Sequence, residues 1–258
     1  MTDNAHKGRD MHKWEIALNK FLEQYINEPW FVGAVLYGNY ATGNTNKYSS
    51  IDIIIVAAND TQRSEWATCY VDGFLIEYRI DTVSRIEENM ASALATHRHT
   101  DQNMFIHGKI LCDKNGLVKK LRQKAMRDIK KPFTPYSEYE KQFMKYYLWD
   151  KYTALLLLAT SGQNIDLMYW TLIRELIIEY YNFKNLPHVP VGQLIPALTD
   201  KQYAKEHHIS VKPPKTFTDK LMTCMNAKSK TAKMDAIKAF YNYVMRAGGG
   251  FDIGKFRV

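Results

Sequence analysis

The hydrophobic positions in the first third of the chain form short runs separated by polar stretches, a pattern typical of buried strands. Residues 31–37 and 51–57 are apolar at nearly every position and rich in Val and Ile. Strands buried on both faces of a sheet have this composition, whereas a half-exposed strand alternates apolar and polar residues. The stretch between them, residues 38–50, is rich in Gly, Asn, Thr and Ser, and we expect it to be a loop.

Two further apolar runs, residues 67–71 and 74–80, flank the dipeptide Asp72-Gly73. An Asp-Gly pair between two such runs is a strong signal for a two-residue hairpin turn. We therefore expect the third and fourth strands to pair antiparallel. Residues 108–112 predict a short additional strand at an edge of the sheet.

Helical patterns surround these strands. Before them, apolar residues recur at helical spacing until Pro29 ends the pattern: Trp14, Leu18, Phe21 and Tyr25. Ser84 followed by Glu87 predicts a capping box that opens a helix toward Thr96. Residues 119–131 alternate charges with apolar residues at helical spacing, so they predict a helix with a solvated basic face.

Two prolines, Pro132 and Pro135, mark a break near the middle of the chain. Proline cannot continue a helix and favours extended backbone in the residue before it. The strand-rich pattern lies before this break and a helical pattern lies after it. We therefore expect two domains, residues 1–131 and residues 137–258.

The second domain is expected to be helical. Ser137 with Glu140 predicts a capping box, and the helical pattern that follows runs to about Ser161. Asp166 is expected to cap the next helix, whose apolar stripe is Leu167, Trp170, Ile173, Ile177 and Tyr180. Residues 184–217 contain several prolines and are expected to be rich in loops. Two more helices are predicted near residues 219–227 and 231–247, ending at Gly248-Gly249-Gly250.

Composition excludes several protein classes. Hydrophobic residues make up 46% of the chain and aromatic residues 13%, which excludes a disordered protein. The three cysteines are widely separated, which indicates reduced thiols and not disulfides or a zinc site. Four histidines lack matching ligands and are expected at the surface: His97, His99, His207 and His208. The start of the chain is polar and the longest apolar run, Ala154–Ala159, is short, so we expect a cytoplasmic protein without membrane segments.

The formal net charge is +8 and the isoelectric point is about 9.2. A positive protein favours anionic ligands such as nucleotide phosphates or nucleic acid. Charge is the only feature that favours nucleic acid, and the basic residues are spread along the chain without forming one patch.

The candidate catalytic and binding residues lie between Gly38 and Glu77. A glycine turn at Gly38 follows the first predicted strand, and Asp52 opens the second. Glu77 interrupts an apolar run in the fourth strand, where a lone carboxylate is costly unless it is paired or bound to a metal. Its alternative interpretation is an outward-facing strand residue beside Arg79. Magnesium needs only a few converging oxygen ligands because it usually retains several waters.

These residues resemble the signature of the DNA polymerase β-like nucleotidyltransferases. In that superfamily a Gly-Ser turn is followed, about a dozen residues later, by Ser-Asp-x-Asp at the head of a strand. Here the turn reads Gly38-Asn39 and the second element reads Ser49-Ser50-Ile51-Asp52. Among its members the chain looks like the small bacterial nucleotidyltransferases related to the kanamycin and lincosamide transferases. The resemblance implies an α/β (α+β) fold with a mixed sheet, followed by a C-terminal helical domain.

The resemblance also implies roles for individual residues. Gly38 and Asn39 would contact the nucleotide phosphates, while Asp52 and Glu77 would bind Mg²⁺. Ser50, also assigned to the nucleotide and cofactor site, takes the position of the first metal-binding aspartate. A hydroxyl in place of a carboxylate removes one negative charge, so metal affinity is expected to be weakened.

The acceptor side has one candidate. In the antibiotic-modifying relatives a carboxylate of the helical domain helps to deprotonate the acceptor hydroxyl, and a candidate for that role here is Glu175, with Glu179 one turn further on. The alternative is that both lie on a solvated helix face. The resemblance thus implies transfer of a nucleoside monophosphate from Mg-NTP to a hydroxyl of a small molecule. A catalytically inactive nucleotide-binding or interaction protein on the same fold is the alternative.

Overall fold

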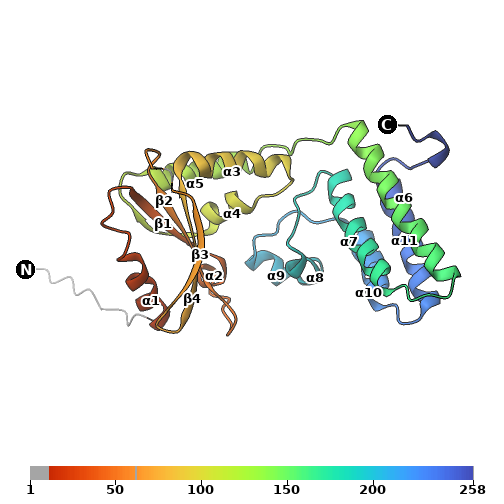
Figure 1. Cartoon of the computed structure of the whole chain (residues 1–258), viewed down its shortest axis with the longest axis horizontal. Helices are drawn as coiled ribbons and strands as arrows, with labels where there is room; N and C mark the ends of the chain where they lie inside the picture. Colours follow the sequence, from red (N-terminus) through yellow and green to blue (C-terminus); the bar gives the residue numbers. More distant parts are fainter. Residues whose placement is uncertain (1–11, 62, 258) are drawn as a thin grey trace, which may run out of the picture. The chain divides into compact units, whose positions relative to one another are not determined.

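The protein is described here by a computed structural model, which covers residues 12–61 and 63–257. The chain folds into two compact units. Unit 1 contains the sheet and comprises the chain up to Ala93 together with His99–Lys131. Unit 2 is helical and comprises Leu94–Arg98 together with the chain from Pro132 onward (Figure 1).

Unit 1 is built on a five-stranded mixed sheet in the order β3-β4-β2-β1-β5. Strands β2 and β4 are parallel, and the other neighbouring pairs are antiparallel. The strands are β1 (Phe31–Tyr37), β2 (Ile51–Ala57), β3 (Glu65–Val71), β4 (Phe74–Thr82) and β5 (Lys109–Asp113). The predicted α/β class with a mixed sheet and a C-terminal helical part is confirmed.

The predicted hairpin between the third and fourth strands is confirmed. Val71 pairs with Phe74, which leaves Asp72 and Gly73 as a two-residue turn. Both turn residues have positive φ, 48° for Asp72 and 85° for Gly73. Positive φ at both positions is the geometry that makes Asp-Gly a favourable hairpin turn.

Hydrophobic side chains cover both faces of the central strands, as their continuous apolar sequences predict. On one face, alternate residues of β1, β2 and β4 pack against α1 (Lys13–Leu22). On the other face, Val35, Ile54 and Val56 pack against helices of unit 1. These helices are α3 (Val83–Ala95), α4 (Thr100–His107) and α5 (Leu117–Asp128). Asp52 alternates with Ile51 and Ile53 along β2, so it lies on the face covered by α3, α4 and α5.

Three local predictions in unit 1 need correction. The segment after β1 was expected to be a loop, but it begins with the short helix α2 (Gly38–Thr42). Helix α4 was not predicted, because its sequence has weak amphipathic spacing. The helix predicted near Ser84 exists as α3. In its first turn, the backbone N–H of Arg85 donates a hydrogen bond to the Thr82 hydroxyl at 3.2 Å.

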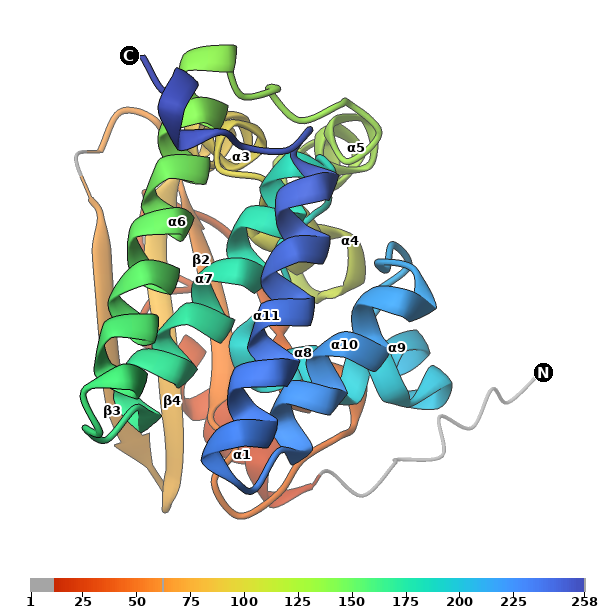
Figure 2. The same ribbon diagram turned by 90° about the vertical axis from the view of Figure 1, so that its right-hand side faces the viewer.

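Unit 2 is a bundle of helices in which α6, α7 and α11 contact one another (Figure 2). Its helices are α6 (Glu138–Thr160), α7 (Asp166–Phe183), α8 (Val191–Thr199), α9 (Lys201–Glu206), α10 (Lys215–Asn226), α11 (Lys230–Ala247) and the 3-10 helix η1 (Ile253–Lys255). The predicted capping box of Ser137 and Glu140 opens α6. The segment predicted to be loop-rich contains α8 and α9, and α8 tolerates Pro196 inside it.

The buried side of α7 agrees with the predicted stripe at Ile173 and Tyr180 and differs from it at other positions. Leu167 is 85% exposed and Trp170 is also exposed, whereas Tyr169, Leu172 and Leu176 are buried. The helix begins one residue earlier than an Asp166 cap requires, since its N-cap is Ile165. Many residues of α7 are apolar, so periodicity alone left its rotation ambiguous.

The short segment Leu94–Arg98 packs within unit 2 through His97, whose ring is fully buried. This ring stacks on Phe133 and contacts Tyr136, and its Nε2 lies 2.9 Å from the carbonyl oxygen of Thr134. The expectation that His97 lies at the surface is therefore wrong. In the part of the chain described, none of the helices is long and apolar enough to cross a membrane.

Candidate functional site

Two carboxylates predicted from the sequence, those of Asp52 and Glu77, stand side by side on the sheet. Asp52 of β2 and Glu77 of β4 are direct partners in the parallel register. Side chains at one register position of neighbouring strands project to the same face. Both carboxylates therefore lie on one face of the sheet, on adjacent strands. The metal-binding roles that the resemblance implies need such an arrangement.

The backbone of Gly38 closes tightly over Asp52. Gly38 follows β1 directly and has a φ of +69°, a conformation that favours glycine. A Cβ atom at Gly38 would overlap Oδ2 of Asp52, far inside van der Waals contact. Glycine is thus required here twice, for the backbone angle and for the space that the carboxylate occupies.

Ser50 and Asn39 make hydrogen bonds within this region. The Ser50 hydroxyl donates to Oδ1 of Asp52 at 2.8 Å. The Asn39 amide donates through Nδ2 to the Ser49 hydroxyl at 3.2 Å, and that hydroxyl also accepts from the backbone N–H of Asn46. Ser50 therefore contacts the Asp52 carboxylate directly, whereas the Asn39 side chain stabilises the loop that leads to Asp52.

The environment of Asp52 disfavours its charged form. Burial raises the pKa of Asp52 to about 6, the hydrogen bond from Ser50 opposes the rise, and the charge of Glu77 adds to it. Tyr37, the register partner of Asp52 on β1, has its pKa raised to about 12 by burial and by the charge of Asp52. An added cation between the carboxylates would relieve this repulsion.

Arg79 is the basic residue nearest to Glu77 along β4, and it is already paired. Its guanidinium forms ion pairs with Asp81 at 2.5 Å and with Asp101 at 2.8 Å. The alternative interpretation places Glu77 as an outward-facing residue beside Arg79. No ion pair between Glu77 and Arg79 is present in the described residues. The carboxylate pair therefore lies beside a cation that other carboxylates neutralise.

The donor set fits a magnesium ion that keeps part of its water shell. Among residues 12–61 and 63–257, no three His, Cys, Asp or Glu side chains converge as a metal cage. Magnesium is commonly held by one or two carboxylates with waters and substrate phosphates, and not by a complete protein cage. Asp52 and Glu77 would supply two such carboxylates. Ser50 has a neutral hydroxyl oxygen at the position where the resemblance implies a third carboxylate.

The acceptor-side candidates lie in unit 2. Glu175 is half-buried and pairs with Arg174 at 2.7 Å. Glu179 is only 8% exposed and accepts a hydrogen bond from Nδ2 of Asn182 at 3.0 Å. The interpretation of Glu179 as part of a solvated helix face is therefore wrong, while the structure leaves the catalytic role of Glu175 a prediction.

Tyr37 is the residue of this region that the sequence did not single out. It ends the apolar run of β1, so it reads as one more core residue. Only the antiparallel register places it opposite Asp52. Its position directly before Gly38 is the signal by which it could have been found.

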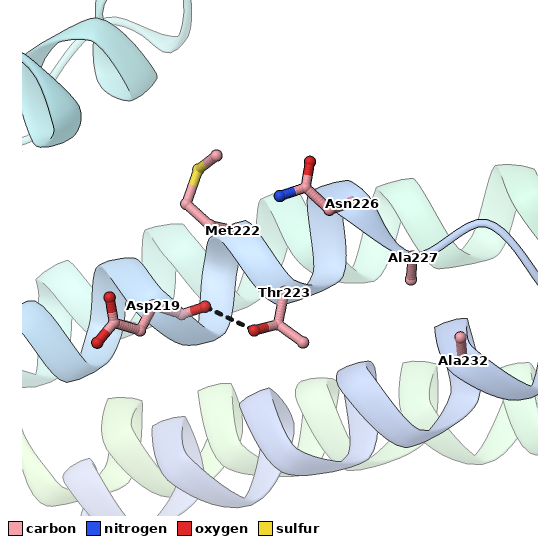
Figure 3. Close-up of a pocket in the computed structure, with 6 residues that line it drawn as sticks. All are labelled: Asp219, Met222, Thr223, Asn226, Ala227 and Ala232. Atoms are coloured by element: carbon pink, nitrogen blue, oxygen red, sulfur yellow. Dashed lines mark hydrogen bonds between the residues drawn. The ribbon is translucent and has the colours of Figure 1, made fainter.

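Unit 2 carries a surface hollow of about 550 Å³ along α10 and the start of α11 (Figure 3). It is lined by Asp219, Met222, Thr223, Asn226, Ala227 and Ala232. The Thr223 hydroxyl donates to the carbonyl of Asp219, whose carboxylate pairs with Lys215. None of the predicted site residues lines this hollow, and its Asp219 and Thr223 side chains are engaged within their own helix.

Comparisons with known proteins gave few matches. No protein-family model matches the chain, and no curated protein matches it. One solved structure similar to the chain is that of a nucleotidyltransferase-like protein from Exiguobacterium sibiricum 255-15. That structure shares 10% sequence identity with a TM-score of 0.43, and the alignment covers 92% of this chain and 77% of that chain.

Proposed function

We propose that this protein transfers a nucleoside monophosphate from Mg-NTP to a hydroxyl group of a small molecule. One observation carries the proposal: Asp52 and Glu77 share a register position on parallel strands, directly beside the Gly38 turn. Nucleotidyl transfer needs a positioned phosphate and neutralised charge more than it needs covalent chemistry from the protein. Two carboxylates beside a glycine turn supply these two requirements.

Gly38 and Asn39 would contact the triphosphate. At Gly38 the space that a side chain would fill is taken by the Asp52 carboxylate, so the glycine brings the turn close to the proposed metal site. Asp52 and Glu77 would hold Mg²⁺, with Ser50 as the neutral neighbour. The metal ion would supply charge neutralisation at the phosphates and hold them in line for displacement. Binding of a cation would also favour the ionised form of Asp52, whose pKa is raised to about 6 in its absence.

For the acceptor, we propose a small molecule, as in the kanamycin and lincosamide transferases that the chain resembles. Glu175 would accept the proton of the attacking hydroxyl. It is half-buried, and Arg174 is its ion-pair partner at 2.7 Å. Three separated free cysteines fit the reducing conditions of the cytoplasm, where we place the protein.

A second candidate function is nucleotide binding without transfer. The observation that favours it is the hydrogen bond from Ser50 to Asp52, which satisfies one carboxylate oxygen with a neutral donor. A site with two carboxylates could bind one Mg-NTP and yet lack the charge that stabilises the transition state. The two functions differ in turnover and not in nucleotide binding.

The test measures binding and turnover separately. Each of the four NTPs is titrated in Mg²⁺ by calorimetry, and pyrophosphate release is then followed with a panel of hydroxyl compounds. Pyrophosphate release that requires Mg²⁺ and is lost in Asp52→Asn supports transfer. Tight Mg-NTP binding with no release against any acceptor supports the second candidate, and no Mg-dependent NTP binding contradicts both.

The role of Glu175 and the binding of nucleic acid are each tested by a separate measurement. We expect Glu175→Gln to lower kcat by about 100-fold with little change in the KM for NTP, as for a general base; unchanged kcat removes Glu175 from the mechanism. Oligonucleotide binding that falls steeply with salt would point to a nucleic-acid substrate, since released counterions drive such binding.

A further inference from the structure

Strand β3 forms an open edge of the sheet. It lies at one end of the strand order and pairs with β4, and no other strand of the described chain pairs with it (Figure 2). An edge strand presents unpaired N–H and C=O groups that can pair with another strand. The run from Trp66 to Val71, of sequence WATCYV, contains no charged residue and no proline that would block such pairing.

The opposite edge of the sheet is protected. Strand β5 has five residues, of which the first is Lys109 and the last is Asp113, and these charges discourage edge-to-edge pairing. β3 is longer and carries a charge only at its first residue, Glu65. The two edges of one sheet thus differ in the features by which proteins protect edges.

The solvent face of β3 carries two large aromatic residues. Trp66 is 81% exposed and Tyr70 is 75% exposed, with the exposed Thr68 between them. All three lie on the sheet face that carries Glu77, because Thr68 and Glu77 are register partners. Single exposed apolar residues are ordinary, but two aromatic rings on one unprotected edge strand are not.

The arrangement of these residues is self-complementary. We propose that β3 is a dimer interface, at which a second copy of this chain adds its own β3 antiparallel with Thr68 of both copies at the two-fold axis. In this register Trp66 of each copy stands opposite Tyr70 of the other. Ala67 of each copy stands opposite Cys69. The two sheets thereby become one continuous sheet.

Side-chain chemistry favours this register. Directly opposed aromatic residues are among the most stabilising cross-strand pairs, and two-fold symmetry forms the Trp66–Tyr70 pair twice. A slip by one residue would pair each aromatic residue with a residue of the opposite sheet face, and both Trp66–Tyr70 pairs would be lost.

A contact made by one seven-residue strand is expected to bury less surface than the roughly 1,600 Å² of a standard stable interface. We therefore expect a reversible equilibrium between monomer and dimer, with a dissociation constant on the order of micromolar. The interface lies one strand away from Glu77, so dimerisation extends the sheet face that carries the carboxylate pair without covering Asp52 or Glu77.

The first test is sedimentation of the full chain over a range of concentrations, comparing Trp66→Lys with Tyr48→Lys. Tyr48 is 83% exposed in the loop before β2, outside β3, so the two variants introduce the same charge at equally exposed aromatic positions. We expect a micromolar dimer that Trp66→Lys weakens by at least about tenfold and Tyr48→Lys leaves unchanged. A monomer at all concentrations, or a dimer equally stable in both variants, overturns the proposal.

The second test fixes the register. Thr68→Cys is made in a Cys69→Ser/Cys112→Ser background, and mild oxidation is followed on a non-reducing gel. Residues on a two-fold axis face their own copies, so we expect rapid disulfide dimers from Thr68→Cys and only slow ones from Thr199→Cys, an exposed control in unit 2. Equal rates for the two variants would show that β3 does not pair with itself.

Discussion

Two carboxylates of this protein, those of Asp52 in the sheet unit and Glu179 in the helical unit, are shielded from water in similar ways. Burial raises the pKa of both, a neighbouring hydrogen bond opposes the rise, and a second carboxylate adds to it. For Asp52 the neighbours are Ser50 and Glu77; for Glu179 they are Asn182 and Glu175. By this measure alone the two sites are equivalent.

Their surroundings separate them. Glu179 is held by the Asn182 amide, whose oxygen lies 2.7 Å from Nε2 of His188. Burial and the nearby His97 lower the pKa of His188 to about 4, so it is neutral at physiological pH, and Glu179, Asn182 and His188 form a chain of contacts within unit 2. Asp52 instead faces Glu77 at the same register position, under a glycine that leaves room for its carboxylate.

The comparison shows that a raised pKa reports burial, and that function must be argued from what surrounds the group. A carboxylate tied by neutral donors stabilises a core. Two carboxylates side by side repel each other and are stabilised by a cation. The predictions below test this distinction, from the largest expected effect to the smallest.

The Gly38→Ala variant should have the largest effect. Its Cβ would overlap Oδ2 of Asp52, and alanine disfavours the φ of +69°. We expect the free energy of unfolding to fall by about 2–4 kcal/mol and Mg-NTP binding to be lost because Asp52 is displaced. Urea denaturation and nucleotide calorimetry measure these two effects.

Gly43→Ala is the matched control. Gly43 has a similar φ of +84°, but nothing lies within 4 Å of the position that its Cβ would take. We expect it to lose only about 1 kcal/mol from backbone strain and to bind Mg-NTP normally. Equal loss of binding in both variants would mean that backbone strain, and not contact with Asp52, explains the Gly38 result.

Magnesium affinity should respond in opposite directions to two substitutions. Asp52→Asn is expected to abolish Mg²⁺ binding while the protein stays folded. Ser50→Asp should raise Mg²⁺ affinity by about tenfold or more, because it restores a charge where the Ser50 hydroxyl lies 2.8 Å from Asp52. Calorimetric titration with Mg²⁺ measures both, and wild-type affinity in both variants would refute the assignment of this pair as the metal site.

Stability should depend on pH through Asp52. Its pKa is raised from 3.8 to about 6 in the folded protein, so between these values the folded state binds more protons than the unfolded state. The free energy of unfolding should therefore fall as pH rises from about 4 to 6 and stay lower above that range. After allowance for solvent screening, this loss is about 1–2 kcal/mol.

Urea denaturation in Mg-free buffer at several pH values measures this dependence. Asp52→Asn should remove that share of the pH dependence and be the more stable protein at pH 7. A wild-type stability that instead rises from pH 4 to 6, by an amount that Asp52→Asn abolishes, would contradict the raised pKa.

Glu179→Gln should have the smallest effect. The new glutamine side chain would still accept the hydrogen bond of Asn182, and the substitution would remove a buried charge, so we expect stability at pH 7 to change by less than about 1 kcal/mol. Mg-NTP binding should be unchanged. Loss of nucleotide binding in this variant would break the distinction between the two carboxylates.

The accuracy of the sequence-based predictions followed the strength of the local signal. Strands β1 and β2, the Asp72-Gly73 hairpin and the capping box of α6 were predicted because each depends on neighbouring residues only. Helices α2, α4, α8 and α9 were missed because they are short or weakly amphipathic. The burial of Glu179 and His97 was missed because it depends on residues distant in sequence.

The sequence by itself determined which segments become strands and helices, and it placed glycine at Gly38 and carboxylates at Asp52 and Glu77. Spacing along a chain cannot state which strands are neighbours, since that depends on packing between distant segments. Only the tertiary structure decided that β2 and β4 lie parallel, with Asp52 level with Glu77 and Tyr37 level with Asp52. It also decided that β3 lies at an edge, because strand order is set by packing of the whole sheet and not by local preference.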